Sequence, residues 1–274
     1  MYPVPTSLSP SRVDSFTSCP LAFRFSSIEK LPEPGSVHTV KGTLVHRVLE
    51  LLYQHGPTER TPARAHELFP QAWGELIDSD EFLRIGLSTA EADALAAEGR
   101  KLVDQYFDIE NPATIEPVGL ELMLEAQMGS IRLRGIIDRL ERAPDGTLVV
   151  TDYKTGRAPS QAHEQKRFAG VHFYAWLVEQ AMGERPSLVR LVYVPSAKVI
   201  STVPTDQSIN FLPKRTAAVF SAIEKACTTG QFQTNKGPLC NYCAFQRWCP
   251  EFGGDPARAA AEAPVVYAIP GREG

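Results

Sequence analysis

The sequence predicts a mixed α/β fold in which helices flank a central run of strands. Segments between about residues 118 and 156 alternate in polarity and are rich in β-branched residues, which is typical of strands. Segments on both sides, such as 41–56 and 171–183, carry apolar residues at helical spacing. We therefore expect a central mixed sheet covered by helices.

The part of the chain before the strands is expected to be helical. Ser9 and Pro10 are typical of a helix N-cap followed by proline at the first helical position, and Cys19–Pro20 marks a break. Residues 41–56 are predicted to form an amphipathic helix, and a further helix is expected over about 89–107.

The part after the strands mixes both kinds of element. Residues 171–183 are predicted to be helical, and the segments 187–195 and 198–204 are predicted to pair as a hairpin. Another helix is expected to begin near Leu212.

The chain has 274 residues, which is enough for one large domain or two small ones. We expect a single domain over residues 1–252 and a flexible tail over residues 253–274, which are rich in Ala, Pro and Gly. No run of about 18 apolar residues predicts a membrane span. The N-terminus lacks the basic and apolar segments of a signal peptide, so a soluble, cytoplasmic protein is expected.

A tight hairpin is predicted between the second and third of the central strands. Residues 143–147, Ala-Pro-Asp-Gly-Thr, are typical of a three-residue loop in which Gly146 takes the left-handed position. Counting outward from this loop places Asp138 opposite Asp152 on the paired strands. A two-residue loop would instead place the two acids on opposite faces of the sheet.

Two facing carboxylates and a lysine then share one face of the sheet. Lys154 is two residues beyond Asp152, so both side chains point to the same side as Asp138. Directly opposed like charges destabilise a strand pair, and a hard divalent cation such as Mg²⁺ would relieve the repulsion. The alternative is a solvated sheet face with ordinary ion pairing.

Cysteine usage indicates a metal site. The chain has five cysteines, and three of them, Cys240, Cys243 and Cys249, lie within ten residues. An odd count with a C-x-x-C pair and no signal peptide favours metal binding over a disulfide framework. Zinc sites and iron–sulfur clusters normally take four protein ligands, and thiolates satisfy either.

These motifs together resemble the RecB-type branch of the PD-(D/E)XK nuclease family. "IID" followed by "TDYKTG" resembles the catalytic motif, with Asp138 as the first acid and Asp152-Tyr153-Lys154 as the D-x-K element. "GTLVHRVLE" resembles the upstream helix motif, whose histidine falls on His46.

The cysteines resemble those of the branch members that carry an iron–sulfur cluster. "SPSRVDSFTSCPLAFRF" resembles the N-terminal motif of the branch, and Cys19 falls on its cysteine. The three C-terminal cysteines have the spacing of the same members, which include AddB-type nucleases and CRISPR spacer-acquisition nucleases.

The resemblance implies a restriction-endonuclease-like core whose N- and C-terminal helices are tied by a 4Fe–4S cluster. Its ligands would be Cys19, Cys240, Cys243 and Cys249. The remaining cysteine, Cys227, is expected to be an ordinary buried residue of a helix.

The resemblance also implies a DNA nuclease that uses Mg²⁺ or Mn²⁺. The metal would be held by His46, Asp138, Asp152 and the backbone carbonyl of Tyr153, and Lys154 would assist catalysis. Glu121 is a further candidate acid upstream of Asp138, whereas Glu50 is expected to make a surface ion pair.

One motif departs from the family pattern. The family's Q-x-x-x-Y helix has Gln four residues before Tyr, but here Gly170 precedes Tyr174. Tyr174 is therefore a candidate DNA contact without the usual partner, whose role could fall to Gln165 or His172.

The overall charge does not by itself indicate a nucleic-acid-binding protein. The net charge is -4, from 28 Lys and Arg against 32 Asp and Glu, although local patches decide such binding. The resemblance favours an exonuclease acting on single-stranded DNA or DNA ends in repair or recombination, with a helicase as a candidate partner. The alternatives are a DNA-binding or helicase-partner module with a weak or regulatory nuclease site, and a zinc-stapled α/β scaffold of unrelated function.

Overall fold

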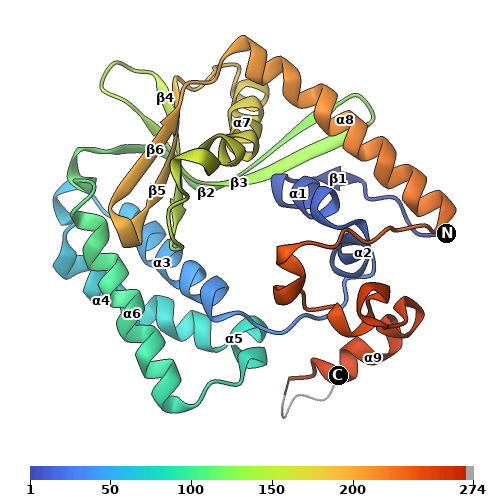
Figure 1. Cartoon of the computed structure of the whole chain (residues 1–274). Coiled ribbons are helices and arrows are strands. Elements are labelled where there is room, and N and C mark those ends of the chain that lie inside the picture. The colour runs from blue at the N-terminus through green and yellow to red at the C-terminus, as the bar shows by residue number, and fades with distance from the viewer. Residues whose placement is uncertain (270–274) are drawn as a thin grey trace. The chain divides into compact units, whose positions relative to one another are not determined.

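The computed structural model describes residues 1–269, and it describes their side chains except those of residues 161–169. The chain divides into two compact units. One unit, here called the terminal unit, comprises Met1–Pro34, Glu125–Arg134 and the residues from Asn210 onward; the other, the core unit, comprises Gly35–Leu124 and Gly135–Ile209. The two chain ends thus belong to the same unit (Figure 1).

The core unit contains five helices and most of the sheet of the described chain. The helices are α3 (Val37–Tyr53), α4 (Pro62–Ile77), α5 (Asp80–Ile85), α6 (Thr89–Phe107) and α7 (Gln161–Met182). Figure 1 shows α4 and α6 beside α3. The predicted amphipathic helix forms α3, whose stripe of Leu44, Val48, Leu51 and Leu52 is buried against its neighbours.

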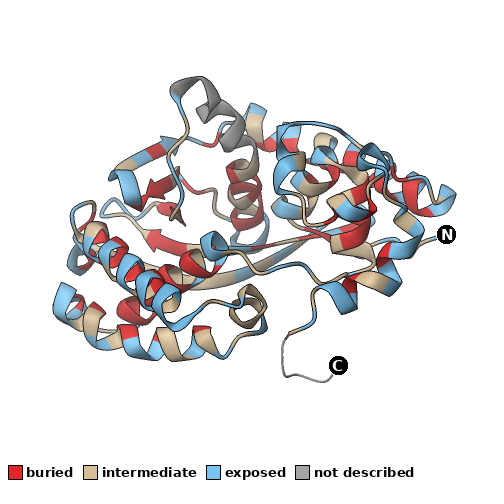
Figure 2. Cartoon of the chain, turned by 60° about the horizontal axis from the view of Figure 1, so that its bottom comes forward, coloured by how far each residue is buried: buried red, intermediate tan, exposed pale blue. Residues whose placement is uncertain are grey.

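Strands of both directions make the sheet of the core unit. The strands are β2 (Glu116–Met128), β3 (Ile131–Arg142), β4 (Leu148–Lys154), β5 (Leu188–Tyr193) and β6 (Lys198–Thr202). β3 pairs antiparallel with β4, β4 parallel with β5, and β5 antiparallel with β6, so the predicted hairpin of β5 and β6 is confirmed. Every residue from Leu148 to Tyr153 is buried, as expected of a strand covered on both faces, and Figure 2 shows buried residues along the strands.

The hairpin between β3 and β4 has the predicted three-residue loop. Ala143 N donates to Thr147 O at 2.8 Å, and Gly146 N donates to Ala143 O at 2.8 Å. Gly146 has a φ of +86°, which a residue with a Cβ rarely adopts. The resulting ladder runs from Arg142↔Leu148 to Arg139↔Thr151, which is the predicted register.

The terminal unit is built from short helices and turns. It contains β1 (Ser7–Leu8), which pairs parallel with the first residues of β3, α1 (Pro10–Ser18), α2 (Pro20–Phe23) and most of α8 (Asp206–Thr229). Ser9 caps α1 by accepting a hydrogen bond from Arg12 N at 3.3 Å, with Pro10 at the first helical position as predicted. Cys227 of α8 is fully buried, as expected.

The residues assigned by sequence to a flexible tail include a helix, α9 (Ala259–Val266). Ala259 and Ala263 of α9 are fully buried, and Trp248 Nε1 donates to Glu262 Oε2 at 2.8 Å. The small alanine side chains allow this close packing, whereas Val265 and Val266 of the same helix are exposed. No helix within residues 1–269 is long and apolar enough to cross a membrane.

Candidate functional site

The two acids of the hairpin meet where the β3–β4 ladder ends. Asp138 Oδ2 accepts a hydrogen bond from Tyr153 N at 2.7 Å; Asp138 lies one residue and Tyr153 two residues beyond the last ladder pair. Asp152 lies on the same strand as Tyr153, and its Oδ2 is 2.5 Å from Lys154 Nζ. The side chains of Asp138 and Asp152 are only 12% and 11% exposed, so both carboxylates are largely withdrawn from water.

Helix α3 brings His46 to this hairpin. His46 Nε2 lies 3.1 Å from the backbone oxygen of Tyr153, and its Nδ1 lies 3.6 Å from Asp138 Oδ2. The histidine therefore contacts both the D-x-K strand and the first acid. The same helix carries the buried stripe, so helix packing fixes the position of His46.

Glu121 of β2 completes a group of three possible ligands. Its Oε1 lies 3.8 Å from His46 Nδ1, and one ligand atom each of His46, Glu121 and Asp138 lie within 4.8 Å of one another. Glu121 has a φ of +41°, a left-handed conformation that is strained for a residue with a side chain. Such strain recurs at functional sites, because the surrounding structure must hold it in place.

The acids of the site are closer than their charges favour. Burial raises the pKa of Asp138 to about 7, and the charge of Asp152 contributes to the rise. Burial also raises the pKa of Glu121, with further contributions from Glu50 and Asp152, while His46 acts to lower it. Burial alone would lower the pKa of Lys154, but the charge of Asp152 raises it above its ordinary value, so the ammonium group is favoured.

The donor set fits a hard divalent cation. Asp152 Oδ2 is buried and, despite its short ion pair with Lys154, has no partner in hydrogen-bond geometry. Carboxylate oxygens and one imidazole nitrogen converge here, and Mg²⁺ and Mn²⁺ select such oxygen-rich sites. A cation would offset the mutual repulsion of the acids.

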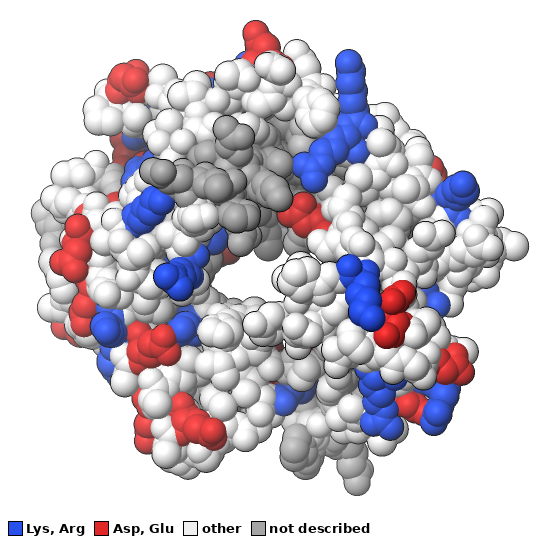
Figure 3. Space-filling view, viewed as in Figure 1, with Lys and Arg blue, Asp and Glu red and all other residues white. Residues whose placement is uncertain are grey.

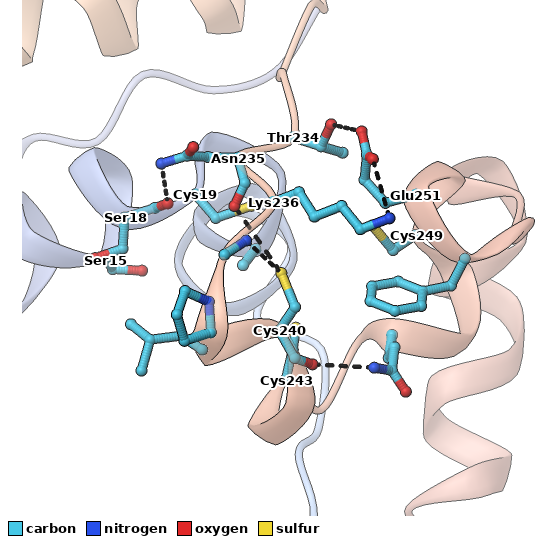
Figure 4. Close-up of a pocket in the computed structure, with 16 residues that line it drawn as sticks. Ser15, Ser18, Cys19, Thr234, Asn235, Lys236, Cys240, Cys243, Cys249 and Glu251 are labelled. Carbon is cyan, nitrogen blue, oxygen red and sulfur yellow. Dashed lines mark hydrogen bonds and ion pairs between the residues drawn. The ribbon is translucent and has the colours of Figure 1, made fainter.

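The terminal unit holds a second group of possible ligands. Cys19, Cys240, Cys243 and Cys249 line one cavity of about 460 Å³ (Figure 4). Burial raises the pKa of Cys243, and the charges of the other three thiols raise it further. The four thiols are therefore near enough to influence each other's ionisation.

Backbone amides point at the sulfur atoms of this cavity. Gly237 N lies 3.4 Å from Cys240 Sγ. Burial raises the pKa of Cys249 as it does that of Cys243, and backbone hydrogen bonds at Glu251 and Phe245 offset these rises in part. Amide donors favour thiolates, which are the form that binds metals. Four cysteine ligands are the number that a zinc site or an iron–sulfur cluster normally takes.

Two hydrogen bonds join the region of Cys19 to the segment before Cys240. Leu21 N donates to Gln233 O at 3.1 Å, and Asn235 Nδ2 donates to Ser18 O at 2.9 Å. Cys19 lies between Ser18 and Leu21, so these bonds bring a cysteine of the N-terminal segment to those more than two hundred residues later.

The sequence model of the PD-(D/E)XK nuclease superfamily matches residues 7–250. The chain belongs to this superfamily. The match includes the hairpin acids, His46 and all four cysteines of the cavity, so both groups lie within the part of the chain that the superfamily shares.

Curated relatives are similar at low identity. One subunit of the ATP-dependent helicase/deoxyribonuclease of Streptococcus mutans serotype c (strain ATCC 700610 / UA159) is 28% identical over 161 residues, which are 56% of this chain and 14% of that relative. The Gene 69 protein of Mycobacterium phage L5 is 23% identical over 286 residues, covering 89% of this chain and 96% of that protein.

A solved structure shares the fold. The structure of a "Putative exonuclease" from Eubacterium rectale has a TM-score of 0.52 and 10% identity, with 88% of each chain covered. At this identity the similarity concerns the fold alone, and it agrees with the mixed α/β class of this PD-(D/E)XK chain.

The helix with the altered Q-x-x-x-Y motif lies against the β3–β4 hairpin. Tyr174 of α7 is half-buried, and a Cβ placed on Gly135 of β3 would lie 3.0 Å from its ring. Glycine at this position therefore permits the close approach of α7 to β3. His172, one of the two candidates for the role of the missing Gln, has its Nε2 3.5 Å from Thr202 Oγ1, and the side chain of Gln165 lies outside the described residues.

Two features of the site exceed the sequence prediction. The sequence makes Glu121 only a further candidate acid, yet it lies 3.8 Å from His46, against 3.6 Å for Asp138. Arg139, adjacent to Asp138, is fully buried behind the site; it lies on the inward side of β3 together with Ile137 and the buried Glu141. Glu50 forms the expected ion pair, 2.7 Å from Arg47 Nη1.

The surface charge is mixed. On the face drawn in Figure 3, Lys and Arg (blue) lie in small groups among Asp and Glu (red). This pattern agrees with the nearly balanced composition.

Proposed function

We propose that this chain is a DNA nuclease of the RecB type that uses Mg²⁺ or Mn²⁺. The observation that carries the proposal is that His46 lies 3.6 Å from Asp138, while Asp152, paired with Lys154 at 2.5 Å, is near enough for its charge to act on Asp138. Membership of the superfamily supports phosphodiester hydrolysis as the reaction.

His46, Asp138, Asp152 and the carbonyl of Tyr153 would hold the metal, with Glu121 as an additional acid. A bound divalent cation polarises a phosphate and lowers the pKa of a water molecule. The contact of His46 Nε2 with Tyr153 O keeps two of these groups together, and the hydrogen bond from Tyr153 N orients Asp138.

Lys154 would act on the reacting phosphate or on the attacking water. Its ammonium group lies beside Asp152, and its side chain is 43% exposed, so it can reach a substrate from the edge of the site. A cation in this position stabilises negative charge that develops on the phosphate in the transition state.

The four cysteines of the cavity in the terminal unit would bind a 4Fe–4S cluster with a structural role. Support comes from their shared cavity, from the amide donors at their sulfur atoms, and from the resemblance of their spacing to the iron–sulfur branch. Zinc is the alternative occupant. In both cases the metal would join the helices of the two chain ends.

The substrate would be single-stranded DNA or DNA ends, cut as an exonuclease in repair or recombination. The similarity to part of a helicase/deoxyribonuclease and the fold shared with a "Putative exonuclease" favour this choice. They also favour a helicase as a partner. The second candidate is a helicase-partner module with a weak or regulatory site, which Gly170 in place of the usual Gln favours.

A digestion assay tests the proposal. End-labelled linear DNA and circular DNA are incubated with the protein and Mg²⁺ or Mn²⁺, beside the Asp152→Asn variant. We expect metal-dependent loss of linear DNA by the wild type and none by the variant. The matched control is Asp93→Asn, which changes an exposed acid of α6 and should leave cleavage intact. If Asp152→Asn degrades DNA at the wild-type rate, the hairpin is not the active site.

A further inference from the structure

A cluster of buried charges lies directly behind the candidate active site. Arg139 of β3 is fully buried, and its guanidinium donates to both carboxylate oxygens of Glu110 at 2.9 and 3.0 Å and to Glu141 at 2.5 Å. Arg190 of β5 also contacts both glutamates. Two arginines and two glutamates thus balance one another.

The two arginines favour the ionised form of Glu110. Burial would raise the pKa of Glu110, yet the guanidinium groups of Arg139 and Arg190 hold it below its ordinary value. A network of this kind is costly to bury, and well-packed apolar residues often give equal or greater stability. A role in placing neighbouring groups would explain why the charges occur here.

Tyr153 connects the cluster with the candidate metal site. Its hydroxyl accepts a hydrogen bond from Arg139 Nη1, while its backbone N donates to Asp138 and its backbone oxygen lies 3.1 Å from His46 Nε2. The side chain is buried, and it lies between Asp152 and Lys154 in the chain. Its anchored ring therefore sets the position of the backbone from which both of these residues project.

We infer that Arg139 is a positioning residue, which acts through the Tyr153 hydroxyl to hold the Tyr153 carbonyl and Asp138 in the geometry that binds a divalent cation. The inference rests on the proposed nuclease function. Neither Arg139 nor the Tyr153 ring would touch the substrate. Groups that orient metal ligands in this way typically contribute about 10- to 100-fold to metal affinity or activity.

The cluster offers a matched control residue. Tyr106 of α6 is also fully buried, and its hydroxyl lies 2.5 Å from the Tyr53 hydroxyl and 3.5 Å from Arg139 Nη1. Replacing Tyr106 or Tyr153 by Phe removes one buried hydroxyl in each case. Only Tyr153 belongs to the strand that carries Asp152 and Lys154.

The test compares Mn²⁺ binding by the wild type, Tyr153→Phe and Tyr106→Phe in the full chain. Free Mn²⁺ is counted by electron paramagnetic resonance during titration of metal-free protein, and cleavage of linear DNA is measured separately. We expect Tyr153→Phe to raise the Kd for Mn²⁺ about tenfold and to lower kcat without changing KM for DNA. Tyr106→Phe should leave both properties at the wild-type level, although the two variants lose similar thermal stability.

A second variant keeps the test decisive if Tyr153→Phe does not fold. Glu141→Gln weakens the hold on Arg139 while keeping the Tyr153 hydroxyl, and it should also weaken Mn²⁺ binding. Wild-type Mn²⁺ affinity in whichever of these variants folds overturns the inference, as does an equal loss in Tyr106→Phe. If the wild type itself neither binds Mn²⁺ nor cuts DNA, the proposed nuclease function fails instead.

Discussion

Tyr153 N donates a 2.7 Å hydrogen bond to the side chain of Asp138 at the point where the β3–β4 ladder ends. The bond replaces strand pairing by a contact between backbone and carboxylate. Asp138 is thereby held beside His46 instead of turning toward solvent. This hydrogen bond thus fixes the carboxylate of a candidate metal ligand just beyond the last residue pair of the β3–β4 ladder.

Removing the charge of Asp152 should weaken metal binding without lowering the stability of the metal-free protein. In the wild type, Mg²⁺ or Mn²⁺ should raise the melting temperature, because a ligand that binds only the folded state adds about 2.7 kcal/mol at one hundred times its Kd. Asp152→Asn keeps the shape of the side chain but removes a charge next to Asp138. The metal-induced rise should shrink, while the metal-free variant should be at least as stable as the wild type.

Differential scanning fluorimetry with EDTA and with added Mn²⁺ measures this effect. Asp93→Asn, which changes an exposed acid of α6, controls for the loss of one acidic charge and should respond to metal as the wild type does. A full wild-type rise in Asp152→Asn would show that Asp152 is not a ligand.

Lys154→Ala should have a different effect from Asp152→Asn. Lysine is not expected to bind the metal, so the Mn²⁺-induced rise in melting temperature should persist while cleavage falls by at least about tenfold. Without metal, the variant should be destabilised by about 1 kcal/mol or less, because the side chain of Lys154 is 43% exposed. Lys101→Ala, an exposed lysine of α6, is the control in the same assays. Retained cleavage in Lys154→Ala would exclude the lysine from the reaction.

The metal-free protein should lose stability as pH rises toward 7. The pKa of Asp138 is raised by burial and by Asp152 to about 7 in the folded state, from 3.8. Between these values the folded state binds more protons than the unfolded state, so the free energy of unfolding falls with increasing pH. Above pH 7 the ionised, buried carboxylate imposes its full penalty, on the order of a few kcal/mol.

Asp138→Asn removes this penalty. In EDTA the variant should exceed the wild type in stability most at pH 8, and the advantage should vanish as pH falls toward 4. Urea unfolding at a series of pH values measures the difference. Saturating Mn²⁺ should reverse the order at pH 8, because only the wild type binds the cation there. A constant difference across this pH range would contradict the raised pKa.

The sequence was sufficient where local chemistry decides the structure. The register that places Asp138 opposite Asp152 depends on a three-residue loop and on Gly146. Both can be recognised in the sequence of residues 143–147 alone. The amphipathic stripe of α3 likewise follows from spacing alone, and it determines which side of the helix His46 occupies.

The remaining features depend on contacts between distant segments. Glu121 reaches His46 only because β2 adopts a left-handed backbone at that residue, which no local turn motif indicates. The charged cluster around Arg139 includes Glu110, from the segment after α6, and Arg190 of β5. The alternation of β3 alone can indicate that a charged residue points inward, but it cannot identify the residues that pair with it. In α9, small alanines make the buried contacts while Val265 and Val266 are exposed, so no stripe of large apolar residues indicates the packed face.

The cysteines give a prediction that separates iron from zinc. Protein purified without oxygen should contain about four iron and four sulfide per chain if Cys19, Cys240, Cys243 and Cys249 hold a 4Fe–4S cluster.

Cys19→Ser should lose the metal and lower the melting temperature, since this ligand closes a very long loop between the two chain ends. Cys227→Ser is the matched control, because Cys227 Sγ lies 3.6 Å from Pro3 O in a buried site on α8 and should leave the metal content unchanged. Iron, sulfide and zinc are measured in all three proteins. One zinc per chain without sulfide in anaerobic wild type would exclude the iron–sulfur cluster, whereas full metal content in Cys19→Ser would exclude Cys19 as the fourth ligand.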